Sequence, residues 1–265
     1  MRNILKFSYG VLGLLFLATV AGYHYGPLLG DDSIKDLSLN LGTEIIGIFL
    51  TVFLIDAVIR RNEERERLRV RKVAMQQLRL PLVLQLQVLH GMYKTAIQHA
   101  PEILPTEVRN LFTKDYFAQI AFLDLSKPAP LWGITPLDWM DYLQSESQKF
   151  KTSLSLTLEK YAVFLDGDTV ELLENILSSH LLAFFQSITA VRELDRKEGF
   201  RRKYNFFAAP GMVEMAREYT TLFTALITIF NQNSPSGRNI RLDLGFWRND
   251  ISPQIGSSRI EADET

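Results

Sequence analysis

Glu44 is the ionisable residue with the most unusual surroundings, because it lies inside an apolar run that extends over residues 41–59. A carboxylate in hydrocarbon is unfavourable unless it is protonated or paired, so an acid there indicates a function or a contact with another helix. The alternative is that Glu44 reaches the outer headgroups or caps the helix after Asn40. Asp56, in the same run, is weaker evidence, since it can form an ion pair with Arg60 four residues later.

Small residues in the same run are suited to close packing of helices. Thr43, Gly47 and Thr51 recur at four-residue spacing and therefore fall on one stripe of a helix. The sequence thus predicts Glu44, Gly47, Thr51 and Asp56 as residues of transmembrane packing or function. Their packing partner is either another span of the same chain or a second copy of it.

The densest basic and aromatic cluster after this run begins near residue 196. Its cations are Arg196, Lys197, Arg201, Arg202 and Lys203. Its aromatic members are Phe200, Tyr204, Phe206 and Phe207. Such a cluster can hold anionic lipid headgroups, or a nucleic-acid backbone whose bases stack on the rings. A solvated loop whose aromatic side chains dock on the rest of the domain explains it equally well.

Signatures of catalysis, cofactors and metals are absent from the sequence. The chain has no cysteine, so it can form neither a disulfide nor a thiolate zinc site. Histidine occurs without the spacing of metal ligands, at His24, His90, His99 and His180. Asp166-Gly167-Asp168 fits a turn that caps a helix better than a cation or sugar-nucleotide site. We therefore predict a protein without enzyme activity, cofactor or metal.

Two apolar runs near the start of the chain are long enough to cross a bilayer. Residues 41–59 give about 19 helical residues, or roughly 28 Å, close to the ~30 Å hydrocarbon core. Residues 7–25 carry no charged side chain and place tyrosines near both ends, as at membrane interfaces. We therefore predict a transmembrane hairpin in residues 1–60. The alternative for the first run is a signal peptide cleaved after Thr19-Val20-Ala21.

Charges that flank the two runs predict the orientation of the hairpin. Arg2 and Lys6 precede the first run, and residues 60–72 hold seven basic residues against three acidic. The segment between the runs carries three acids and one base, in residues 31–36. The positive-inside rule then places both termini in the cytoplasm. We predict a two-pass protein of the bacterial inner membrane.

The chain after residue 60 keeps helical spacing and predicts an all-α fold. Residues 61–80 should form a juxtamembrane helical stalk, which Pro81 ends or kinks. Residues 81–232 should form a cytoplasmic helical bundle, with helices over 82–99, 106–125, 136–165, 168–194 and 210–230. Residues 233–265 should form a mobile or partner-dependent tail, in which residues 239–247 alternate as a short strand would.

The second apolar run resembles a bacterial membrane hairpin that opens many uncharacterised proteins. The residues that carry the resemblance are Asn40-Leu41-Gly42-Thr43-Glu44, with Gly47 nearby and Arg60-Arg61 after the run. The architecture is also similar to the two-span effectors of antiphage systems such as retrons. This resemblance implies a cytoplasmic sensor part that restrains a membrane-damaging part.

These patterns together predict a non-enzymatic inner-membrane protein whose cytoplasmic domain senses or binds a partner and whose spans anchor or perturb the membrane. The predicted partners are the lipid bilayer, a cytosolic protein or nucleoprotein, and a second copy of the chain through the spans. A passive membrane-anchored scaffold that recruits a cytosolic partner is the alternative. An oligomeric channel, and an enzyme whose site forms only on folding, are further alternatives.

Overall fold

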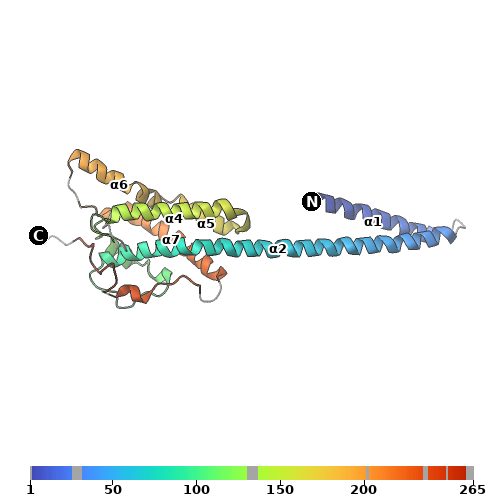
Figure 1. Cartoon of the computed structure of the whole chain (residues 1–265), viewed down its shortest axis with the longest axis horizontal. Helices are drawn as coiled ribbons and strands as arrows, with labels where there is room; N and C mark the ends of the chain where they lie inside the picture. The colour runs from blue at the N-terminus through green and yellow to red at the C-terminus, as the bar shows by residue number, and fades with distance from the viewer. Residues whose placement is uncertain are drawn as a thin grey trace. The chain divides into compact units, whose positions relative to one another are not determined.

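The computed structural model describes residues 2–25, 32–129, 137–200, 203–234, 238–248 and 250–260. The chain divides into two compact units, Met1–Leu68 and Arg69–Thr265 (Figure 1). Within the described ranges the regular elements are α-helices and short 3-10 helices, and strand pairing is limited to isolated bridges. The predicted all-α fold class is therefore confirmed.

The first unit contains the helix α1, Arg2–Tyr25, and the N-terminal part of the helix α2, Asp32–Ala96. Thr19 of α1 lies against Gly42 of α2, and a Cβ atom added at Gly42 would lie 3.6 Å from Thr19 Oγ1. Thr19 is buried, as is Ile45 one turn further along α2. The two helices therefore pack against each other through small residues.

The sequence predicted that Pro81 ends or kinks its helix. The helix α2 does not end there but continues through Pro81 to Ala96. A proline in a helix removes one backbone hydrogen bond and crowds the preceding turn. Leu78 and Leu82 flank Pro81, and both are completely buried in the core of the second unit. Burial of these turns opposes the local effect of the proline, so the helix is retained.

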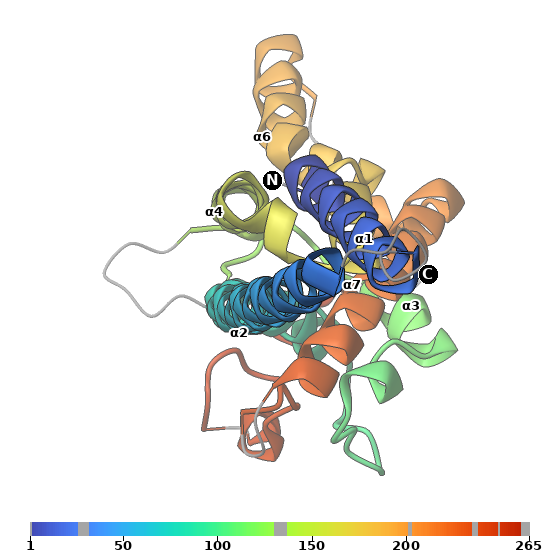
Figure 2. The same cartoon turned by 90° about the vertical axis from the view of Figure 1, so that its right-hand side faces the viewer.

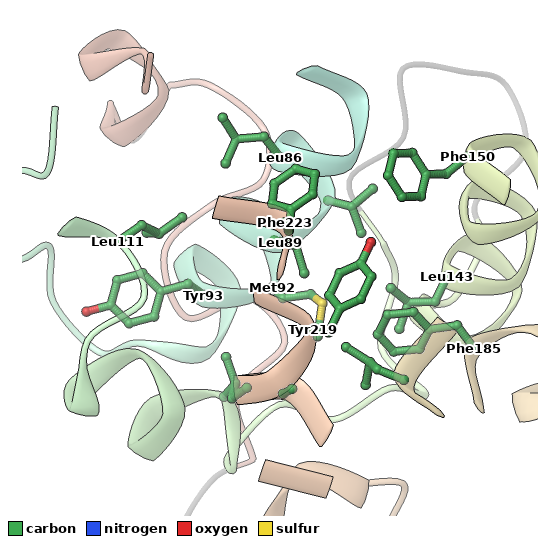
Figure 3. Close-up of a cluster of buried hydrophobic side chains, with 14 of the residues drawn as sticks. Leu86, Leu89, Met92, Tyr93, Leu111, Leu143, Phe150, Phe185, Tyr219 and Phe223 are labelled. Carbon is green, nitrogen blue, oxygen red and sulfur yellow. The ribbon is translucent and has the colours of Figure 1, made fainter. Parts of the chain in front are cut away.

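The second unit is a helical bundle built around the C-terminal part of α2. Its other long helices are α4, Trp139–Tyr161; α5, Gly167–Leu177; α6, His180–Glu198; and α7, Pro210–Asn233. The helix α4 packs on α6, and α7 packs on α5, α6 and the short helix α3, Lys114–Ile120, beside it in Figure 2. Apolar side chains from α2, α4, α6 and α7 meet in the core, together with Leu111 from the segment before α3 (Figure 3).

Several helix boundaries differ from the predicted ones because capping residues interrupt the helical pattern. Asp138 caps α4 by accepting a hydrogen bond from the Asp141 amide at 2.9 Å, whereas the predicted helix start at residue 136 lies outside the described residues. The predicted helix over 168–194 is two helices, which separate at Ser178 and Ser179. Serine is favoured at helix ends, although the side chain of Ser179, which begins α6, makes no capping hydrogen bond.

The predicted helix over 106–125 is also interrupted. It consists of a 3-10 turn η2, Val108–Asn110, and then of α3. Thr113 begins α3 and accepts a hydrogen bond from the Tyr116 amide at 3.4 Å. Polar capping again decided the boundary. The last helix was predicted well, with Pro210 at its first position and an end three residues beyond the predicted one.

The C-terminal segment, residues 238–248 and 250–260, is packed on the bundle, whereas the sequence predicted a mobile or partner-dependent tail over residues 233–265. Ile240, Leu242 and Trp247 are at most 6 % exposed. The expected strand over 239–247 is absent from the described segment, which instead contains the 3-10 turn η5, Leu244–Trp247. Ile240 and Leu242 alternate with exposed residues because they dock on the core, and the described residues provide no neighbouring strand to form a sheet.

One buried cation fastens this segment to α2. Lys94 is completely buried, and its ammonium group donates to the backbone carbonyls of Phe246, of Arg248 at 3.0 Å and of Ile251 at 2.9 Å. An ammonium group has three protons, so all of them are used. One turn earlier, the ring of His90 lies between Phe246 and Trp247, with centroids at 4.3 and 4.7 Å.

We expect His90 to make the stability of this unit depend on pH. Burial, and then the charge of Lys94, lower the pKa of His90 from 6.5 to about 3. In the unfolded chain His90 binds a proton near pH 6.5, whereas in the folded chain its ring stays neutral down to about pH 3. The stability that the neutral ring contributes is therefore complete above pH 6.5 and is lost as the pH falls toward 3. Between pH 6.5 and 5 the loss should be about 2 kcal/mol.

Urea unfolding of the chain in detergent, followed by circular dichroism at pH 7 and pH 5, measures this loss. His90→Phe keeps an aromatic ring between Phe246 and Trp247 but does not titrate. Its free energy of unfolding should therefore fall less between the two pH values than that of the wild type. Equal losses in the two proteins would show that His90 is not the responsible group.

Candidate membrane-spanning surface

One helix among the described residues is long and apolar enough to cross a bilayer. It is the part of α2 from Asp36 to Ala96, and only 6 % of its most apolar window is buried. The core helix of a soluble protein would be mostly buried, whereas this apolar part of α2 is almost entirely exposed. In α1 the apolar part is shorter, Gly10–Tyr25. A membrane location is thus supported for α2, and the second span stays a prediction.

The exposed side chains of α2 in this window are large and apolar. They are Leu41, Ile46, Ile48, Phe49, Leu50, Phe53, Leu54, Ile55, Val58 and Ile59, each at least 38 % exposed. Soluble proteins rarely leave a continuous apolar surface of this kind uncovered. Hydrocarbon would cover it without requiring any hydrogen bond, because the helical backbone already satisfies its own donors and acceptors.

The side of α2 that faces α1 can be recognised from reduced exposure at three- and four-residue intervals. Its members are Ser38, Gly42, Ile45, Val52 and Asp56. Thr19 of α1 contacts Gly42 on this side. The sequence did not predict Thr19 as a packing residue. The sequence signal that could have identified Thr19 is that a small polar residue stands in the middle of an apolar run, where helices can approach closely.

Glu44, and Gly47 and Thr51 of the predicted stripe, lie on the opposite side of α2 and are exposed. A Cβ atom added at Gly47 would meet nothing within 4 Å. The Thr51 hydroxyl donates to the carbonyl of Gly47 at 2.8 Å, which satisfies it inside its own helix. Glu44 has no hydrogen-bond or ion-pair partner in the described part of the chain. This stripe therefore does not hold α1.

Asp56 and Arg60 form the ion pair that their spacing predicted. Arg60 Nε lies 2.9 Å from an Asp56 carboxylate oxygen. The Asp56 side chain is 13 % exposed, and that of Arg60 is 65 % exposed. The guanidinium thus neutralises the acid at the end of the apolar surface, where a membrane interface would lie. A structural role accounts for Asp56 without further function.

The predicted basic and aromatic cluster is divided by the fold. Phe207 is completely buried, and the Phe206 ring packs edge-on against Phe184 with centroids 5.4 Å apart. Phe200 is 64 % exposed. The cations Arg196 and Lys197 lie on the exposed last turn of α6. Docked rings cannot stack on bases, so Phe206 and Phe207 are part of the bundle.

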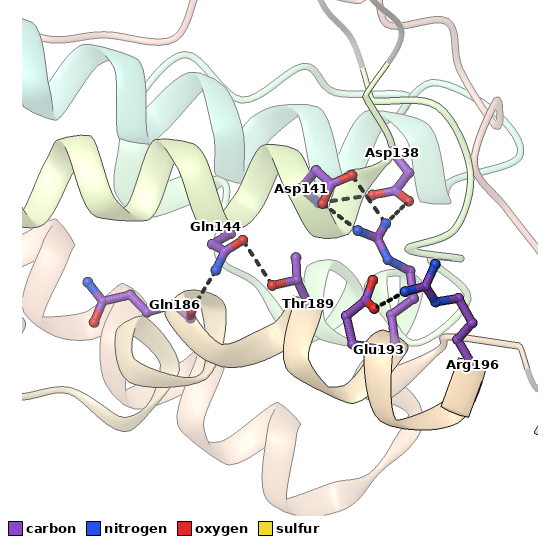
Figure 4. Close-up of polar contacts among 8 residues, drawn as sticks. Asp138, Asp141, Gln144, Gln186, Thr189, Glu193 and Arg196 are labelled. Atoms are coloured by element: carbon purple, nitrogen blue, oxygen red, sulfur yellow. Dashed lines mark hydrogen bonds and ion pairs between the residues drawn. The ribbon is translucent and has the colours of Figure 1, made fainter. Parts of the chain in front are cut away.

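The individual cations of the cluster do not form one described site. Arg196 pairs with Glu193 at 2.8 Å on the same helix (Figure 4). Lys203 has interactions of its own. Arg201 and Arg202 lie outside the described residues. The proposed contact of this cluster with lipid or nucleic acid therefore stays a prediction.

Polar contacts between α4 and α6 were not predicted from the sequence. Arg192 of α6 binds the carboxylates of Asp138 and, at 2.6 Å, Asp141 at the start of α4 (Figure 4). Further along, Gln144 accepts from the Thr189 hydroxyl at 2.9 Å and donates to the Gln186 carbonyl at 3.0 Å. These contacts fix α6 on α4. Their role is therefore to stabilise the packing of the two helices.

No group of three or more histidine, cysteine, aspartate or glutamate residues in the described ranges could hold a metal ion. Comparisons with protein-family models, curated proteins and solved structures found no match to this chain. The assignment of function therefore depends on the geometry of the chain itself.

We expect Thr19→Cys together with Gly42→Cys to form an intramolecular disulfide. The Thr19 Cβ lies 3.9 Å from the Cβ position at Gly42, within the range of about 3.5–4.5 Å that disulfides require. The natural chain contains no cysteine, so no other pair competes. After mild oxidation, thiol labelling followed by mass spectrometry should show loss of both free thiols.

The matched control is Thr19→Cys with Gly47→Cys. Gly47 lies on the other side of α2, so both thiols should remain free. Free thiols in the Gly42 pair, or a disulfide in the Gly47 pair, would contradict the assignment of Gly42 as the residue that faces α1.

Proposed function

We propose that the protein is anchored in the bacterial inner membrane by α2, with α1 as a second span, and that the unit Arg69–Thr265 is a cytoplasmic domain that binds a partner or signal. The observation that carries the proposal is the apolar surface of residues 41–59, which is exposed around most of the helix. A length of about 19 helical residues matches the hydrocarbon thickness.

Two further features support this arrangement. The contact of Thr19 with Gly42 gives α1 a defined place beside α2, as two spans of a hairpin require. Beyond residue 59 the helix becomes strongly basic, and basic residues next to a span favour the cytoplasmic side. The bundle then lies on the same side of the membrane as the N-terminus.

The orientation can be tested with single cysteines in the cysteine-free chain. We expect Ser33→Cys, at the start of α2, to react with a membrane-impermeant maleimide in intact spheroplasts. Ser187→Cys, on the exposed side of α6, should react only after the membrane is permeabilised. Labelling of Ser187→Cys before permeabilisation would overturn the proposed topology. The intact mass of the same protein shows whether α1 is retained or cleaved as a signal peptide.

Glu44 favours a second candidate function, which is perturbation of the membrane. Its carboxylate is exposed on the side of α2 away from α1, among side chains that hydrocarbon would cover. A lipid-facing acid is stabilised by protonation, by water that it draws into the bilayer, or by a second copy of the helix. Water drawn to the carboxylate would perturb the bilayer, and pairing with a second copy of the helix would change the assembly of the protein.

On overexpression, we expect the wild type to lower the membrane potential of cells if the spans perturb the membrane. Glu44→Ala should then abolish the effect by removing the charge, and Gly47→Leu should weaken it by blocking approach to the same stripe. A potential-sensitive dye reports the result. If all three proteins leave the potential unchanged at equal membrane abundance, perturbation is excluded and anchoring alone is retained.

A further inference from the structure

A pocket of about 310 Å³ lies between α3 and α7 in the unit Arg69–Thr265. Three elements of the fold contribute one cation each to its lining: Arg109 from η2, Lys114 from α3 and Arg217 from α7. No acidic side chain is among its described lining residues. Positions far apart in the sequence thus bring three cations to one pocket, an arrangement that attracts an anion.

The cations keep groups available for a ligand. Arg109 uses its Nε to pair with Glu107 at 2.6 Å, and Arg217 uses its Nε toward Glu214 at 3.7 Å. The terminal nitrogens of both guanidinium groups make no described hydrogen bond. Lys114 has neither a hydrogen bond nor an ion pair in the described part of the chain. Guanidinium and ammonium groups of this kind are the usual partners of phosphate.

Neighbouring side chains fix the position of the charges and add neutral donors. The guanidinium of Arg217 lies over the ring of Phe117, 5.1 Å from its centroid, which orders a side chain that would otherwise be mobile. The Thr113 hydroxyl accepts from the Tyr116 amide at 3.4 Å, so its own proton remains free to donate into the pocket. Thr224 adds a second hydroxyl.

The pocket also offers more room and more apolar surface than a bare ion needs. Phe112 and Phe117 form its aromatic wall. A second pocket of about 390 Å³ adjoins it and shares Arg109 and Thr224 as lining residues. Volumes of roughly 300–1,000 Å³ with a few convergent polar groups are typical of small-molecule sites.

We propose that this pocket binds a phosphorylated small molecule, with Lys114, Arg109 and Arg217 as counter-charges for the phosphate and with the aromatic wall against the rest of the ligand. The inference goes beyond the proposed function, because the pocket belongs to the unit Arg69–Thr265 alone. It holds or fails regardless of whether α1 and α2 span a membrane.

Isothermal titration of the full chain in a neutral detergent tests this site with five probes: inorganic phosphate, AMP, adenosine, glycerol 3-phosphate and glycerol. We expect at least one phosphate ester to bind about 10-fold more tightly than its phosphate-free counterpart, since charge-assisted hydrogen bonds are lost without the phosphate. Tighter binding of AMP than of glycerol 3-phosphate indicates a nucleotide as the ligand, and tighter binding of glycerol 3-phosphate indicates a ligand of the lipid-headgroup type.

Lys114→Gln should weaken binding of that ester about 10-fold, and Lys114→Arg, which keeps the charge, should retain most of it. Because Lys114 is exposed and unpaired among the described residues, neither substitution should alter the melting temperature. The matched control is Lys197→Gln, an exposed lysine on α6 that should bind like the wild type. Absence of binding by every phosphate probe at 10 mM (about the weakest affinity of interest), or equal loss in Lys114→Gln and Lys197→Gln, would overturn the proposal.

Discussion

The uncovered apolar surface of residues 41–59 is the constraint on which the first unit depends. Exposure of one leucine, isoleucine or phenylalanine side chain to water costs about 1.5–3 kcal/mol relative to burial. Roughly five such side chains therefore equal the whole net stability of an ordinary domain, about 5–15 kcal/mol. The fold itself covers only one narrow side of α2, through Thr19 and Gly42. Contacts from outside the chain would remove this cost. A bilayer does so for every exposed position at once, whereas a protein partner would have to match each side chain.

The second unit depends on a different kind of contact, the burial of one cation. A completely buried ammonium group is unfavourable unless its protons find acceptors. In this fold the acceptors of Lys94 are three carbonyls from the C-terminal segment. Any conformation that releases this segment leaves Lys94 without them and also uncovers His90 and Trp247. Segments more than 150 residues apart are therefore ordered together. Burial lowers the pKa of Lys94 for the same reason.

The parts of the structure that could be predicted from the sequence are those decided by neighbours along the chain. The helix start at Pro210 and the Asp56–Arg60 pair follow from local backbone preference and four-residue spacing. Pro81 shows the limit, since its local effect is opposed by burial of Leu78 and Leu82 against helices that come much later. The packed C-terminal segment shows it again, because its polar composition resembles that of a free tail while its few apolar residues have a specific place on the core. The choice of Gly42 over Gly47 as the contact of α1 needed the register of two helices, which periodicity does not provide.

Charge illustrates the same difference between sequence and space. The cations near residue 196 are dense in the sequence, yet the fold packs Phe206 and Phe207 on the core and pairs Arg196 with Glu193. Arg109, Lys114 and Arg217 are unremarkable in the sequence, yet η2, α3 and α7 bring them to one pocket. Local density of charge is compatible with a solvated helix end, where each cation finds its own water or acid. The pocket differs, because Lys114 has no acid of its own among the described residues and the terminal nitrogens of Arg109 and Arg217 make no described hydrogen bond. A bound anion would accept from these donors, so their convergence is the stronger indication of a ligand.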